Sequence, residues 1–164
     1  MTRKITVGIL TISDRGAAGS YEDKSGPVIE HVVTTQLEAQ VEQKAVIPDE
    51  IDLIKATLLQ WVEQDQVDLI LTTGGTGIAE RDVTPEAIRG LMRVEIPGFG
   101  EVMRARSMEI TPNALLSRGL GAVVERSLVL ALPGKPSGAV ECLGFVAAAL
   151  PHAVKLALRE PTSC

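Results

Sequence analysis

A glycine-rich segment, TTGGTG at residues 72–77, closes the apolar run 67–73 and offers the clearest chemistry in the sequence. Glycines leave backbone N–H groups open and permit positive φ angles, so such a loop can cradle an anion. It is no dinucleotide fingerprint, because Glu80 stands where the last glycine belongs, and it lacks the Gly-Lys-Ser/Thr of a P-loop. A plain tight turn is the alternative. The candidate ligand-binding residues are Thr73, Gly74, Gly75, Thr76 and Gly77.

Two aspartates follow apolar runs at comparable places. Asp82 comes just after the glycine loop, and Asp49 comes just after the run 41–47. Carboxylates at neighbouring strand ends can share an Mg²⁺ ion bound to a polyphosphate. The alternative for both is helix capping, which needs only a short polar side chain. Arg81, beside Asp82, can pair with phosphate or can simply be solvated.

Polar residues also follow the first and last apolar runs. Ser13 and Asp14 close the run 5–13, and a local turn is the alternative to ligand binding there. The turn PGKPSG supplies the candidates Pro133, Gly134 and Lys135. No Ser–His–Asp or Cys–His arrangement stands out, and two histidines without a cysteine cluster argue against a structural zinc site.

The elements that position these loops alternate between strands and helices. Strands are predicted at 5–13, 41–47 and 67–73, with a hairpin or two short strands within 121–132. Helices are predicted at 25–38, 49–65, from about 84, at 97–109 and at 137–159 with a kink at Pro151. Ser25, Asp49 and Thr84 are the expected caps. This order predicts an α/β fold: a three-layer, doubly wound, mostly parallel sheet with helices on both faces, whose strand-end loops converge.

Composition limits the functional classes. A length of 164 residues predicts a single domain over 1–164, and 45% hydrophobic residues with only 2% aromatics predict an aliphatic core. The formal net charge of −5 argues against nucleic-acid binding. The N-terminal run lacks the features of a signal peptide, and charged residues with Pro151 interrupt the most apolar segment, 138–158. A cytoplasmic protein outside the membrane is expected.

Five motifs in order give the chain a family resemblance: IPDE, LTTGGTG with RDVTPEA, PGFGEVMR, TPNALLSR and LPGKPSGAVEC. Over residues 4–158 the chain resembles the molybdopterin adenylyltransferases of molybdenum cofactor biosynthesis, the MogA-type enzymes and gephyrin-like G domains. The resemblance implies transfer of AMP from ATP to molybdopterin with Mg²⁺, a homotrimer, and a molybdenum-inserting protein as downstream acceptor. It implies catalytic and metal-binding roles for Asp49 and Asp82, and a pterin-binding role for Ser117.

Two departures concern the pterin side of the implied site. Lys135 stands where similar proteins often carry a neutral amide, and Ala131 stands where the plant type has asparagine. A MoaB-type relative and a non-catalytic molybdopterin carrier or scaffold module remain the alternatives. The intact RDVT run favours the MogA type, and the presence of both carboxylates favours an enzyme over a carrier.

Overall fold

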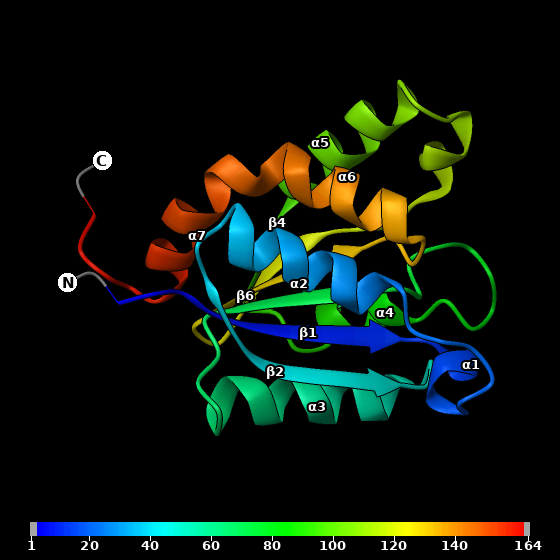
Figure 1. Cartoon of the computed structure of the whole chain (residues 1–164). Coiled ribbons are helices and arrows are strands. Elements are labelled where there is room, and N and C mark those ends of the chain that lie inside the picture. The colour runs from blue at the N-terminus through cyan, green and yellow to red at the C-terminus, as the bar shows by residue number, and fades with distance from the viewer. Residues whose placement is uncertain (1–2, 163–164) are drawn as a thin grey trace.

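The computed structural model describes residues 3–162, which fold around a six-stranded sheet with strand order β2-β1-β3-β6-β5-β4 (Figure 1). The parallel strands are β1 (Thr6–Ile12), β2 (Gln40–Ile47), β3 (Leu69–Thr73) and β6 (Ser127–Leu132). The antiparallel strands at one side are β5 (Gly121–Val124) and β4 (Val94–Ile96). The predicted mostly parallel sheet is confirmed.

Helices cover both faces of the sheet and complete the three predicted layers (Figure 1). One face carries α2 (Ser25–Thr35), α5 (Pro97–Met108), α6 (Pro136–Val146) and α7 (Leu150–Ala157). The other face carries α3 (Ile51–Glu63) and α4 (Thr84–Arg89). Because successive strand residues point to opposite faces, Leu69 and Leu71 pack in the first layer and Ile70 packs in the second. Burial on both faces explains the nearly continuous apolar sequence of β3.

Gly8 lets α3 lie close to the sheet. A Cβ atom at Gly8 would lie 2.6 Å from a ring carbon of Trp61, which is buried on α3. Any larger side chain at position 8 would therefore push the indole away from β1. The close contact fixes the helix that follows β2, and with it the loop that carries Asp49.

The structure corrects several local predictions. β4 is not among the predicted strands, because three half-exposed residues give no clear strand pattern. Ser25 does not cap α2; the amides of Ser25 and Gly26 instead donate to Asp23 Oδ1, at 3.1 and 3.0 Å. Thr84 is no cap either, because its hydroxyl donates to the Gly74 carbonyl at 2.9 Å. The predicted hairpin is confirmed, and Glu125 takes a φ of 51° in its turn.

The last helical segment breaks earlier than predicted. α6 ends at Val146, and the short 3-10 turn η2 (Ala147–Ala149) separates it from α7. Pro151 lies in the first turn of α7, where a missing N–H costs nothing. The proline thus follows the break, because it has no N–H to bond the carbonyl four residues earlier and so cannot continue the helix from α6.

The stretch Pro136–Ala157 is long and apolar enough to cross a membrane by length and composition alone. Its apolar residues nevertheless form part of the core: Leu143, Leu150 and Val154 are at most 1% exposed and pack in the first helical layer. Core helices of proteins without a membrane segment can be equally long and apolar. We therefore interpret the stretch as a core element.

Candidate functional site

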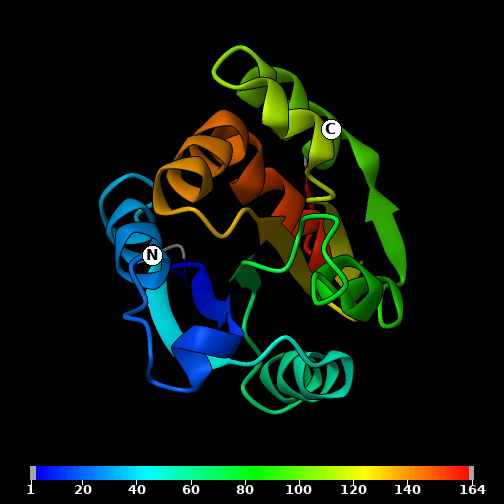
Figure 2. The same ribbon diagram turned by 90° about the vertical axis from the view of Figure 1, so that its right-hand side faces the viewer.

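The predicted strand-end loops do converge. The carboxyl ends of β1, β2, β3 and β6 lie at one edge of the sheet, which Figure 2 views end-on. The short helix α1 (Asp14–Ala17) follows β1 there, and the 3-10 turn η1 (Pro112–Leu116) leads toward Ser117. This is the edge at which open α/β sheets bind ligands.

The glycine loop takes a conformation that requires glycine at two positions. Gly74 has a φ of 101° and Gly75 a φ of 66°. A Cβ atom at Gly74 would lie 2.2 Å from the carbonyl oxygen of Ile12, so β1 itself excludes a side chain. The Gly74 amide donates to Leu132 O at 3.2 Å, which ties the loop to the end of β6. The loop is therefore a fixed structure held by two strands.

Hydroxyl and amide groups hold the glycine loop and the turn 133–135 in place. Thr73 Oγ1 donates to Pro133 O at 2.7 Å, and Ser25 Oγ donates to Gly134 O at 2.6 Å. The backbone amide of Thr84 donates to Gly75 O at 3.1 Å. The predicted segments 73–77 and 133–135 therefore lie side by side, with Gly134 packed against the backbone of Gly74.

Asp49 and Asp14 bind each other's backbones. The Asp14 amide donates to Asp49 Oδ2 at 2.9 Å, and the Asp49 amide donates to Asp14 Oδ1 at 3.0 Å. Asp49 is therefore not the helix cap that the sequence suggested; Glu50 holds that position and makes no side-chain cap. The other oxygen of Asp49 faces Gly75, where a Cβ atom would lie 3.0 Å from it.

Asp82 lies beside the last residue of the glycine loop, Gly77. Its Oδ2 accepts a hydrogen bond from the Ala79 amide at 2.9 Å and lies 2.7 Å from the position of a Cβ at Gly77. It does not cap α4, whose preceding residue is Val83. Both predicted carboxylates thus contact the glycine loop, and burial, together with the charges of Asp14 and Asp82, raises the pKa of Asp49.

Arg81 pairs with carboxylates in this structure. Its guanidinium donates to both oxygens of Asp14, at 2.9 and 2.8 Å, and to Glu50 at 2.9 Å. This hydrogen bonding lowers the pKa of Asp14. Arg81 is half exposed, so an anionic ligand would have to compete with Asp14 and Glu50 for it. The predicted phosphate contact therefore remains a prediction.

A cavity of about 350 Å³ lies beside the loop, between α1, α2 and the turn after β6. The predicted residues Ser13, Thr73, Gly74, Gly134 and Lys135 line it. Arg15 and Lys24 add positive charge to its wall, and both lie against the ring of Tyr21. Hydroxyls, glycine backbone and cations are the groups that bind polyphosphates.

A second cavity, of about 410 Å³, lies between α5, η1 and α6. Ser117, Pro133 and Lys135 line it, together with apolar side chains such as Met103 and Ala131. Lys135 also lines the first cavity, so the two cavities lie next to each other at this residue. No hydrogen bond or ion pair of the Lys135 ammonium is seen within residues 3–162. Asp49 and Asp82 line neither of these two cavities.

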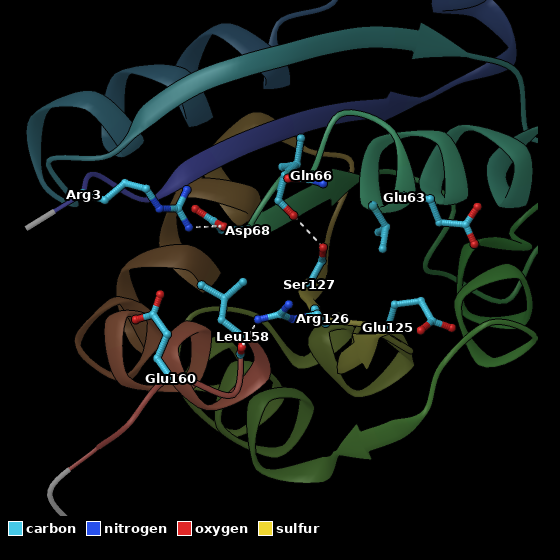
Figure 3. A pocket seen from close by; sticks show the side chains of 11 residues that line it. Arg3, Glu63, Gln66, Asp68, Glu125, Arg126, Ser127, Leu158 and Glu160 are labelled. Carbon is cyan, nitrogen blue, oxygen red and sulfur yellow. Dashed lines mark hydrogen bonds and ion pairs between the residues drawn. The ribbon is translucent and has the colours of Figure 1, made fainter.

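A larger cavity, about 640 Å³, lies at the opposite ends of the strands (Figure 3). Several of its polar groups are already engaged within the protein. Asp68 accepts from Arg3 at 2.8 Å and from the Thr6 amide at 2.8 Å, and Ser127 Oγ donates to Val67 O. Size alone therefore does not make this cavity the functional site.

Sequence analysis missed Arg118, which makes the most side-chain hydrogen bonds to the glycine loop segment of residues 76–82. Its guanidinium donates to Gly77 O at 2.7 Å and to Asp82 O at 2.6 Å, and it pairs with Glu86. Its own amide donates to Thr76 O at 2.7 Å. No local pattern around SRG signals this role, because its partners lie 32 to 42 residues away in the sequence.

The raised pKa of Asp49 predicts a pH-dependent change in stability. A carboxyl group whose pKa is higher in the folded chain than in the unfolded chain loses its stabilising contribution as pH rises through the raised pKa. Asp49→Asn keeps an oxygen for the Asp14 amide and removes the partly buried charge. It should raise the unfolding temperature at neutral pH by about 1–3 °C.

That gain should disappear below the ordinary aspartate pKa of about 4, where Asp49 is protonated in both states. Thermal unfolding measured across this pH range checks the expectation. Asp65→Asn, which removes an exposed carboxylate, is the control and should change stability by less than about 0.5 kcal/mol. A gain that persists unchanged in acid would contradict the explanation.

The fold and this edge define an α/β protein with a glycine-loop ligand site at the carboxyl ends of a mixed sheet. Comparison with known proteins is specific: the family described as a probable molybdopterin binding domain matches residues 8–152. The chain belongs to this family of molybdenum cofactor biosynthesis domains.

Relatives of two types match the chain about equally well. A molybdopterin adenylyltransferase of Helicobacter pylori J99 is 43% identical over 155 residues, which cover 94% of this chain and 88% of that protein. One from Escherichia coli K12 is 43% identical over 85% of this chain and 72% of that protein. The crystal structure of the molybdopterin biosynthesis enzyme MoaB from Thermus thermophilus has a TM-score of 0.89 at 44% identity, covering 97% of this chain and 99% of that one.

Proposed function

We propose that this protein is a nucleotidyltransferase of molybdenum cofactor biosynthesis that transfers AMP from ATP to molybdopterin. A terminal phosphate oxygen of molybdopterin attacks the α-phosphorus of ATP, the bond to the β-phosphate breaks, and pyrophosphate leaves. The observation that carries the proposal is the meeting of two cavities at Lys135, beside the glycine loop. A bisubstrate reaction between two phosphate compounds needs such a junction. The names and similarity of the adenylyltransferase relatives support it.

The linings of the two cavities suggest which substrate each holds. The cavity with Arg15, Lys24 and exposed glycine backbone suits the triphosphate of ATP. The cavity of apolar side chains with Ser117 suits a pterin ring system, because such rings bury apolar surface and make few directed polar contacts. Their phosphates would then meet at Lys135.

The proposed reaction requires the protein to position the two substrates and to neutralise phosphate charge. The nucleophile belongs to the substrate, so the absence of a nucleophile–base pair in the sequence is no obstacle. The protein must align two phosphates that repel one another and offset the charge that develops on the leaving pyrophosphate. Lys135 and the backbone amides of the glycine loop are the groups placed to do so.

Asp49 and Asp82 fit a role in holding Mg²⁺. Oxygen ligands are those that Mg²⁺ prefers. Burial, and to a lesser extent the nearby charges of Asp14 and Asp82, raises the pKa of Asp49, and a bound cation would offset both effects. Within residues 3–162 no three carboxylate, histidine or cysteine side chains converge into a complete metal site. The two aspartates would therefore hold the ion only partly, with substrate phosphate and water as further ligands. Bound Mg²⁺ would neutralise phosphate charge.

Replacing Lys135 tests the junction. Lys135→Gln should lower kcat/KM by about 10- to 50-fold for both ATP and molybdopterin, because one cation contacts both phosphate groups. Lys24→Gln is the matched control, since Lys24 lines the first cavity alone and should affect ATP only. Steady-state kinetics with each substrate varied in turn gives the comparison. A Lys135→Gln effect confined to one substrate would contradict the shared position.

One assay tests the function itself. Purified protein is incubated with molybdopterin, ATP and Mg²⁺, and adenylylated molybdopterin and pyrophosphate are measured. Formation of both products in equal amounts is expected. Binding of molybdopterin without AMP transfer would instead favour the non-catalytic carrier or an inactive MoaB-type relative.

The remaining parts of the proposal concern assembly and location. A homotrimer, a cytoplasmic location and a molybdenum-inserting protein as the acceptor of the product follow from the family resemblance. Sedimentation or light scattering at several protein concentrations would test the trimer.

A further inference from the structure

Arg118 lies next to the Ser117 that lines the second cavity, yet its side chain points to a different part of the site. The guanidinium of Arg104 donates to the carbonyls of Ser117 and Gly119, at 3.4 and 2.8 Å, and so holds the backbone on both sides of Arg118. Arg118 extends to the glycine loop. Residues 117 and 118 therefore connect the wall of one cavity to the loop that carries Asp82.

The hydrogen bonds of Arg118 join the two ends of the segment 77–82, which follows the glycine loop. The guanidinium binds the carbonyl of Gly77 and the carbonyl of Asp82 at the same time, at 2.7 and 2.6 Å. Between these two points, the Asp82 amide donates to Ala79 O at 2.9 Å and the Ala79 amide donates to Asp82 Oδ2 at 2.9 Å. The position of the Asp82 carboxylate relative to Gly77 thus depends on a side chain from outside the loop.

We propose that Arg118 is a positioning residue for the reaction, which fixes the backbone at Gly77 and Asp82 so that the Asp82 carboxylate faces the glycine loop. This inference rests on the proposed function for its catalytic consequence. Only an arginine suits the position, because a planar guanidinium with five N–H donors can reach three acceptors at once, whereas a lysine ammonium on a flexible stem cannot hold them in one plane.

The ion pair with Glu86 offers a way to separate two roles of Arg118. Glu86 is half exposed, and the hydrogen bond from Arg118 lowers its pKa. The ion pair therefore joins Arg118 to the exposed surface of α4. Glu86→Gln removes the ion pair and leaves the bonds to Gly77 and Asp82 possible. If Arg118 acts by positioning the loop, Glu86→Gln should keep turnover within about threefold of the wild type.

The experiment compares Arg118→Lys with Glu86→Gln and with Arg89→Gln, which removes a surface arginine paired with Glu95. Arg118→Lys should lower kcat by about 10- to 100-fold while the KM values for ATP and molybdopterin change less than about threefold. Glu86→Gln and Arg89→Gln should behave like the wild type. Equal loss in Glu86→Gln and Arg118→Lys would overturn the proposal, as would an active Arg118→Lys.

Hydrogen exchange gives a readout that needs no activity. The amides of Ala79 and Asp82 bond within the loop, so their exchange should be at least about tenfold faster in Arg118→Lys and unchanged in Arg89→Gln. Unchanged exchange in Arg118→Lys would overturn the positioning role. A wild-type protein that transfers no AMP would overturn the proposed function instead, and the exchange data would still decide whether Arg118 holds the loop.

Discussion

Asp82→Asn is expected to lower the rate of AMP transfer by at least about 10²- to 10³-fold, with little change in stability. The asparagine keeps an oxygen for the Ala79 amide, which is the hydrogen bond that Asp82 makes within its loop. It removes the negative charge beside Gly77, and with it the proposed contribution of Asp82 to holding a divalent cation. The loss should therefore appear in turnover at saturating substrate and Mg²⁺.

Glu80→Gln is the matched control for this prediction. Glu80 is exposed in the same loop, two residues away, and its substitution removes the same charge. Turnover within about threefold of the wild type is expected for it, since the long-range effect of one exposed charge is small. Equal losses in both variants would mean that net loop charge, and not the place of Asp82, is what matters. An unfolded Asp82→Asn protein would likewise contradict a catalytic role.

Gly74→Ala is expected to cost about 2–4 kcal/mol of the free energy of unfolding and to remove activity. Two independent reasons point the same way. The φ of 101° is unfavourable for any residue with a side chain, and the added Cβ would lie 2.2 Å from the backbone oxygen of Ile12. Backbone cannot move aside as a flexible side chain can, so the loop and the end of β1 must both shift. Denaturant unfolding and the transfer assay give the two measurements.

Gly144→Ala provides the opposite case. Gly144 is exposed within α6, and no atom lies within 4 Å of the position of its Cβ. Alanine there should stabilise the protein by about 0.5–1 kcal/mol through helix propensity and leave the reaction unchanged. A Gly74→Ala protein as stable as Gly144→Ala would show that the loop does not need its left-handed conformation.

The negative charges of Asp14, Asp49 and Asp82 beside the glycine loop are only partly balanced by contacts within the protein. Asp49 has a raised pKa because it is partly buried and lies near Asp14 and Asp82, and Arg81 balances some of this charge from a half-exposed position. Such an arrangement is a cost to the folded state in the absence of ligand. Cation and phosphate binding would offset it, which is why Asp49→Asn is expected to stabilise the protein while harming the proposed reaction.

The sequence by itself determined most of the strand and helix order, and it predicted that the glycine loop and the other strand-end loops meet at the carboxyl edge of the sheet. These follow from local patterns: continuous apolar runs for buried strands, helical spacing for α3, and glycines directly after β3. The family resemblance carried by the motifs was confirmed by comparison. It also pointed to Ser117, which has no generic chemical signal; Ser117 lines the second cavity, and its pterin-binding role stays a prediction.

Only the tertiary structure decided how the loops use their polar groups. Asp49 does not cap α3 but binds the backbone of Asp14, and Arg81 lies between carboxylates. Arg118 holds a loop about 40 residues away from it, and Lys135 lines two cavities at once. The physical reason is that hydrogen-bond partners and shared cavities depend on which strand ends lie side by side, whereas a sequence pattern reports only neighbours along the chain.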